Sequence, residues 1–141
     1  MKASYPYAED GYDVRGRRLP AIPVLWLELS VASSRLRGPC VIDTGFDGAL
    51  YANEDLALLL EGVKPVGVAS LYAVGEGEIR CELFRVEATL ISEDGAPVLE
   101  LGETTVYVPI YPEALSHEVI AGREILNKLT LKLDGKLVKV L

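Results

Sequence analysis

The sequence has few of the residues that bind metals or form disulfide frameworks. Among its 141 residues there are one histidine, His117, and two cysteines, Cys40 and Cys81. These three residues lie far apart in the sequence, so the ligand spacing of a zinc site is missing and no metal is expected. Both cysteines fall in apolar, strand-like runs, which favours buried, reduced thiols over a disulfide framework.

An excess of positive charge and a long apolar run are missing as well. The net charge is −7, whereas binding to nucleic acid or to an anionic membrane requires a basic surface. No apolar run approaches the ~20 residues of a membrane span, and the N-terminal stretch MKASYPYAEDGYDVRG lacks the apolar core of a signal peptide. We therefore expect a cytoplasmic protein with neither nucleic acid nor membrane as a partner.

The residues that are present suit a single β-rich domain. Half of them, 50%, are apolar, which is enough for a hydrophobic core in a chain of this length. From residue 19 to residue 141, strand-like apolar runs alternate with turns, which predicts a mostly-β domain, either a small closed barrel or a sandwich. Residues 1–18 are polar and rich in tyrosine and glycine, which predicts an irregular arm.

Local signals predict two short helices and two hairpins within this domain. Asn53 can cap a helix over the segment EDLALLL, which Gly62 would end. A second short helix is predicted over REILNKL, where apolar residues recur at helical spacing. Strand-like runs flank the glycine-rich turn at residues 75–77 and the Asp-Gly turn in LTLKLDGKLVKVL, and both patterns are typical of hairpins.

The most specific signal is an Asp-Thr-Gly motif formed by Asp43, Thr44 and Gly45, directly after the apolar run PCVI. Three features, VIDTG, the glycine-tipped hairpin and VIAGREIL, occur in this order and together resemble the retropepsin-like aspartic proteases, the single-domain, dimeric relatives of pepsin. The stretch DTGFDGAL is similar to the microbial branch in which Phe follows the motif. The resemblance covers roughly residues 19–141 and implies an all-β, small closed barrel of the acid-protease type with one or two short helices.

The resemblance implies an aspartic endopeptidase, a hydrolase acting on peptide or protein substrates without a cofactor. Acid–base cleavage of an amide needs one carboxylate to activate water and one to protonate the carbonyl oxygen. The chain has a single Asp-Thr-Gly motif, because the segments EDG and LDG lack the hydroxyl residue. One chain therefore carries half a site, and we expect a homodimer in which each subunit contributes Asp43.

Two such carboxylates are expected to share a proton. At a separation of ~4 Å and an effective dielectric constant of ~20 they repel each other by ~4 kcal/mol, or ~3 pK units. One of the two therefore holds a proton over a wide pH range, as is described for aspartic proteases.

The resemblance also implies a role for each residue of the motif. Asp43 would be the catalytic carboxylate, the Thr44 hydroxyl would hydrogen-bond across the dimer, and Gly45 would let the substrate backbone approach closely. Phe46 would place a bulky ring beside the site, at a position where many relatives have alanine or serine.

Further residues are expected to support and cover this loop. Gly122 would lie in a buried loop beneath the active-site strand, and Arg123 would form an ion pair with Asp47. The flap that closes over the substrate and excludes water would consist of Val74, Gly75, Glu76 and Gly77. The negative charge of Glu76 would disfavour acidic substrates.

Two other functions compete with this interpretation. Asp43, Asp47, Gly48 and Glu54 fall on positions of a calcium-binding loop. Gly45 offers no side-chain oxygen at a position that needs one, and the preceding RGPCVI cannot supply the required helix, so no calcium site is expected. A non-catalytic, dimeric peptide-binding or interaction module with the same fold stays open, because fold does not imply function.

Overall fold

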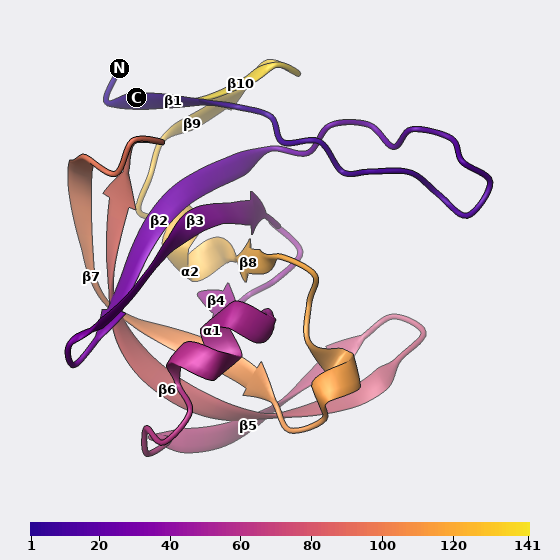
Figure 1. Cartoon of the computed structure of the whole chain (residues 1–141), viewed down its shortest axis with the longest axis vertical. Coiled ribbons are helices and arrows are strands. Elements are labelled where there is room, and N and C mark those ends of the chain that lie inside the picture. Colours follow the sequence, from indigo (N-terminus) through magenta and orange to yellow (C-terminus); the bar gives the residue numbers. More distant parts are fainter.

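The chain folds into a closed barrel with a smaller sheet beside it (Figure 1). The computed structural model describes residues 1–141. Its strands are β1 (Ala3–Pro6), β2 (Val24–Val31), β3 (Ser34–Ile42), β4 (Leu50–Tyr51), β5 (Gly67–Ala73), β6 (Gly77–Ile91), β7 (Pro97–Pro109), β8 (Val119–Ala121), β9 (Leu131–Leu133) and β10 (Leu137–Val140). The helical elements are α1 (Glu54–Leu59), α2 (Arg123–Leu126) and a 3-10 turn (Pro112–Ala114).

The larger sheet closes on itself. Its seven strands follow the order β2-β3-β8-β4-β7-β6-β5, and β2 also pairs with β6. This additional pairing makes a barrel of all its strands except β5, which stays outside as an edge strand paired with β6. The predicted fold class, an all-β closed barrel with two short helices, is confirmed.

Buried and exposed residues alternate along β6, which shows how this strand contributes to the hydrophobic core of the barrel. Phe84, Val86, Ala88 and Leu90 are buried, whereas Arg85 and Glu87, which lie between the first three of them, are exposed. Successive side chains of a strand point to opposite faces, so the buried set lies on the inner face of the barrel. Apolar side chains from β2, β4 and β7 join it to form the main hydrophobic cluster.

Strands β3 and β8 lie side by side in parallel, with Val41 opposite Ile120 and Ile42 opposite Ala121. Parallel neighbours end at the same edge of a sheet. The loop that follows β3 therefore meets the segment that leads from β8 into α2. This adjacency brings two segments far apart in the sequence, VIDTG and VIAGREIL, into one place.

Helix α1 begins and ends where its local signals predicted. The Asn53 side-chain oxygen accepts a hydrogen bond from the Leu56 N–H (3.0 Å) and so caps the first turn. Gly62 follows with a φ of +82°, a left-handed conformation that ends helices and favours glycine. Neither helix of the structure has the length and apolar character needed to cross a membrane.

The central hairpin has the predicted glycine tip. Strands β5 and β6 pair in antiparallel fashion from Gly67 opposite Leu83 to Ala73 opposite Gly77. Gly75 and Gly77 adopt φ angles of +81° and +72°, which glycine tolerates without strain. Beyond Leu83, β6 continues into the barrel, so the hairpin is an extension of a barrel strand that projects from the body (Figure 1).

The predicted C-terminal hairpin forms, and the N-terminal strand joins it. β9 and β10 pair in antiparallel fashion, and β1 adds to the other edge of β10. The expected irregular arm over residues 1–18 is therefore wrong for its first part. The reason is burial, because Tyr5 is fully buried and its hydroxyl donates a hydrogen bond to the Ile91 carbonyl (2.6 Å).

The rest of the N-terminal segment is a long loop that extends away from the barrel (Figure 1). Isolated bridges join Ala8 to Ile22 and Tyr12 to Arg18, without a regular strand. The Tyr12 side chain is 71% exposed, so it does not share the anchoring role of Tyr5.

Burial of the Tyr5 hydroxyl makes the stability of the terminal sheet, formed by β1, β9 and β10, depend on pH. Burial first, and the charge of Glu93 second, raise the pKa of Tyr5 from 10.0 to about 12. Because the folded-state pKa lies above the unfolded one, the protonated phenol stabilises the fold. This contribution is complete below pH 10.0 and is lost as the pH rises to about 12.

We expect Tyr5→Phe to destabilise the fold by about 1 kcal/mol at pH 7, because the Ile91 carbonyl loses its donor. The variant is also expected to lose less stability than the wild type when the pH rises from 10.0 to about 12. Urea unfolding followed by circular dichroism at several pH values measures both effects. If the two proteins lost the same amount of stability between pH 10.0 and about 12, the burial of Tyr5 would not be the cause of the pH dependence.

Candidate active site

Asp43 lies directly after β3, at the end of the parallel β3–β8 pair. Its backbone N–H donates a hydrogen bond to the Ala121 carbonyl of β8 (3.0 Å). The Gly45 N–H donates to Asp43 Oδ1 (2.9 Å), which turns the carboxylate back over its own loop. A Cβ atom on Gly45 would lie only 3.2 Å from the same oxygen. Glycine therefore gives the carboxylate the room to accept this bond.

The loop formed by residues 43–49 is held by backbone hydrogen bonds from the start of α2. The bonds run from Gly122 N to Ala49 O (2.8 Å), from Arg123 N to Phe46 O (2.8 Å) and from Glu124 N to Gly48 O (3.2 Å). The first N–H groups of a helix have no partner inside the helix. The loop carbonyls satisfy these groups, so the helix start and the candidate catalytic loop stabilise each other.

Two glycines make this contact possible. A Cβ atom on Gly122, which is buried, would lie 2.3 Å from Gly48 O and 2.6 Å from Phe46 O. On Gly48 it would lie 2.6 Å from the Phe46 ring and 2.7 Å from the Tyr107 ring. All four distances are too short for carbon in contact with these atoms. A side chain at Gly122 would therefore require the loop backbone to shift, and one at Gly48 would displace the two rings.

The Phe46 ring belongs to the packing of the loop as well as to the site. It meets the ring of Tyr51 edge to face with centroids 6.2 Å apart, and the ring of Tyr107 with centroids 5.4 Å apart. Aromatic pairs at this separation and angle are favourable. The bulky residue beside the motif therefore fills the space that Gly48 and Gly122 leave open.

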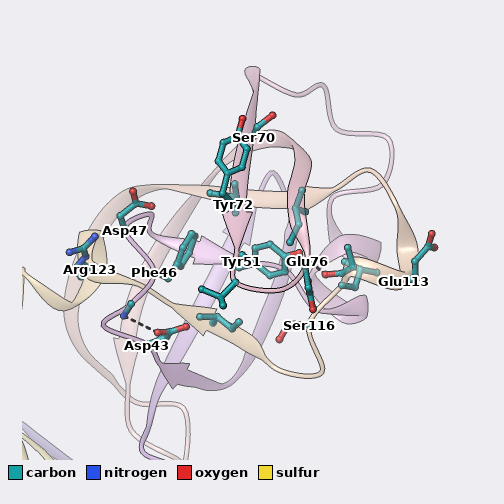
Figure 2. A pocket seen from close by; sticks show the side chains of 18 residues that line it. Asp43, Phe46, Asp47, Tyr51, Ser70, Tyr72, Glu76, Glu113, Ser116 and Arg123 are labelled. Carbon is teal, nitrogen blue, oxygen red and sulfur yellow. Dashed lines mark hydrogen bonds between the residues drawn. The ribbon is translucent and has the colours of Figure 1, made fainter.

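The expected ion pair between Asp47 and Arg123 is not formed, because the ion pairs of the structure join other residues. Both side chains are exposed and border the same cavity, on one side of it in Figure 2. Exposed charges gain little from pairing, since water solvates each of them well. The two segments are joined by the backbone bond between Arg123 and Phe46 instead.

Asp43 borders a cavity of about 720 Å³ (Figure 2). The loop after β3, the tip of the β5–β6 hairpin and the segment 113–116 each form part of its wall. Its volume falls within the range of ~300–1,000 Å³ that is typical of ligand pockets. No group of three or more His, Cys, Asp or Glu side chains is arranged to hold a metal ion.

Most of the predicted site residues border this cavity. They are Asp43, Gly45, Phe46, Asp47, Val74, Glu76 and Arg123. The predicted residues that do not border it are Thr44, Gly75, Gly77 and Gly122. Thr44 is exposed, and the two hairpin glycines shape the turn that carries Val74 and Glu76.

Several apolar wall residues were not among the predicted ones. Tyr51 of β4, Leu71 of β5, Ile79 of β6 and Ile120 of β8 all border the cavity. Leu71 and Ile79 lie directly opposite each other in the hairpin, so alternation along its strands could have identified them. Tyr51 and Ile120 carry no such local signal, because only closure of the barrel brings them to the site.

Tyr51 is a fixed part of the wall. Its hydroxyl donates a hydrogen bond to the Ala114 carbonyl (2.5 Å). Burial, followed by the charges of Cys81 and Glu76, raises the pKa of Tyr51 to about 12. The phenol therefore stays neutral at pH 7 and ties the wall strand β4 to the segment around the 3-10 turn.

Comparison with solved structures identifies the fold. The chain is similar to the crystal structure of a retropepsin-like aspartic protease from Rickettsia conorii, with a TM-score of 0.54 and 12% sequence identity over 99% of this chain and 98% of that one. No protein-family model and no curated protein matches the sequence. A likeness at this identity shows the fold alone. The chain thus has the retropepsin-like fold that its motifs predicted.

We expect Gly122→Ala to destabilise the protein by about 2–4 kcal/mol, because the new methyl group overlaps backbone atoms that cannot rotate away. Gly38→Ala is the matched control, since a Cβ atom there meets nothing within 4 Å and the backbone is not left-handed. It is expected to change the free energy of unfolding by less than about 0.5 kcal/mol. Equal urea midpoints for the two variants would contradict the close packing at Gly122.

Proposed function

We propose that the protein is an aspartic endopeptidase that hydrolyses peptide bonds with water activated between two Asp43 carboxylates, one from each subunit of a homodimer. The observation that carries the proposal is the position of Asp43. In a retropepsin-like fold, this residue of an Asp-Thr-Gly motif directly follows β3 and borders a cavity of about 720 Å³. A carboxylate held at the rim of a pocket has the chemistry that amide hydrolysis needs.

The need for a second chain follows from what lies beside Asp43. In the parallel register, Ile42 is opposite Ala121, so the next residue along β8 is Gly122, which has no side chain to offer. The other carboxylates that border the cavity are Asp47, Glu76 and Glu113. None of them is the aspartate of an Asp-Thr-Gly motif. A second Asp43, related by a two-fold axis, would complete the pair.

Exposure of the motif supports this assembly. Thr44 and Gly45 are exposed at the tip of the loop, although the loop that carries them is rigidly held from beneath. In the dimer the Thr44 hydroxyl would bond to the partner loop, and Gly45 would leave room for the substrate backbone. Gly122 and the start of α2 would support the loop, and the hairpin tip with Val74 and Glu76 would close over the peptide.

The reaction would use one carboxylate in each protonation state. The ionised Asp43 would take a proton from a bound water as that water attacks the carbonyl carbon of the peptide. The protonated Asp43 of the second subunit would give its proton to the carbonyl oxygen. As the intermediate collapses and the C–N bond breaks, the first Asp43 would give the proton that it took from water to the leaving nitrogen. The second Asp43 would take back a proton from a hydroxyl of the intermediate, which leaves a carboxylic acid and an amine as products.

We expect the wild type to cleave peptides from a mixed library between pH 3 and 7 and Asp43→Asn to lose at least about a hundredfold in kcat/KM, since an amide cannot take the proton from water. Mass spectrometry of the digests, with and without a statine-type inhibitor, measures this loss. If the folded wild type and variant are equally inactive, the endopeptidase is excluded. A dimeric peptide-binding module would then be the remaining function of the fold.

We also expect Thr44→Ala to weaken the dimer by about tenfold or more, because each subunit loses one inter-subunit hydrogen bond worth ~1 kcal/mol. Thr44→Ser keeps the hydroxyl and is the matched control. Sedimentation equilibrium of both variants over a range of concentrations measures the dissociation constants. A wild type that is monomeric at every concentration, or a Thr44→Ala dimer as tight as the wild type, would contradict the assembly.

A further inference from the structure

We propose that the cavity at Asp43 selects peptides with a lysine or arginine at some distance from the scissile bond, and that Glu76 on the hairpin tip is the residue that recognises this charge. The inference rests on the proposed function for its substrate, a peptide. It adds the class of peptide and names a specificity residue that takes no part in the chemistry. Glu113, on the 3-10 turn, would add to the same negative field.

The cavity has two distinct ends. Figure 2 shows Asp43, Asp47 and Arg123 at one end and Glu76, Ser116 and Glu113 at the other. The charge of Glu76 also contributes to the raised pKa of Tyr51, whose side chain borders the same cavity.

Apolar side chains also line the cavity. Phe46 and Tyr51 lie between its two ends in Figure 2, and Leu71, Ile79 and Ile120 border the same cavity. A peptide that lies along the cavity would therefore place an apolar side chain near Asp43. A side chain further along the peptide would reach the end where Glu76 lies.

The negative end lacks a positive partner within the chain. Neither Glu76 nor Glu113 takes part in an ion pair. Arg80, on the same hairpin, pairs with Glu78 instead (3.9 Å), and Arg123 lies at the opposite end of the cavity. A bound peptide would remove water from the Glu76 carboxylate, which costs free energy unless a cation replaces that water. Lysine or arginine on the peptide would supply this cation.

Two-fold symmetry extends the preference to both sides of the scissile bond. A homodimer presents the same cavity twice, with one copy on each side of the paired Asp43 carboxylates. The best substrates would then carry a basic residue on the N-terminal side and another on the C-terminal side. A neutral side chain would be tolerated at either place, and an acidic one would be repelled at both.

The experiment uses peptides of equal length in which one position at a time is Lys, Gln or Glu. Their affinities for the folded Asp43→Asn protein are measured by fluorescence anisotropy, and their kcat/KM values are measured with the wild type. At low salt we expect the best position to favour Lys over Gln by about fivefold and Gln over Glu by a similar factor. Both factors are expected to shrink at ~1 M salt, where exposed charges are screened.

Variants identify the residue that recognises the charge. In either background, Glu76→Gln is expected to reduce the Lys-to-Gln ratio to about one, and Glu76→Lys is expected to favour the Glu peptide, as the sign of the field reverses. Glu113→Gln is expected to reduce the ratio less. Glu100→Gln is the matched control, because Glu100 is an exposed glutamate of β7 that does not border the cavity.

The outcomes separate this inference from the proposed function. Cleavage without a charge preference, a ratio that Glu76→Gln leaves unchanged, or an equal effect of Glu100→Gln would each overturn the inference and leave the endopeptidase intact. Charge-selective binding to the Asp43→Asn protein, together with a wild type that cleaves nothing, would overturn the endopeptidase and support the inference. Absence of both binding and cleavage would overturn both.

Discussion

The contact between Gly122 and the loop of residues 43–49 sets the geometry on which the candidate site depends. Here one backbone touches another, with a hydrogen bond from Gly122 to Ala49 and no space for a Cβ atom. Backbone atoms cannot rotate aside as side chains do, so the separation of the ends of β3 and β8 is fixed by the peptide groups themselves. Asp43 and the Phe46 ring take their positions from this contact.

The barrel gives this contact its rigidity. Strand β2 is bonded on one side to β3 and on the other to β6, and β3 is bonded in turn to β8, so Asp43 does not follow a free edge. The hairpin tip is different, because β5 is bonded only to β6 and its other edge is open. One strand, β6, thus belongs both to the closed barrel and to the less supported hairpin.

Local patterns predicted the parts of the structure that depend on neighbouring residues. The Asn53 cap, the glycine-tipped hairpin and the C-terminal hairpin all follow from a few adjacent side chains. Strand β1 could not be predicted in this way, since Tyr5 finds the carbonyl of Ile91 across a large part of the chain. The predicted ion pair between Asp47 and Arg123 was wrong. The resemblance places the two segments next to each other, but it does not specify whether their side chains or their backbones make the contact. The wall position of Tyr51 likewise depends on closure of the barrel.

The pairing of β1 with β10 joins the two ends of the chain within one subunit. The chain therefore completes its terminal sheet from its own strands and needs no strand from a neighbour to do so. Closing a loop that spans nearly the whole chain costs more entropy than any other pairing here, so this sheet is the most non-local element of the fold. In the proposed homodimer, folding and association would consequently be separable steps. Folding would be independent of protein concentration, and only the meeting of two finished loops around Asp43 would depend on it.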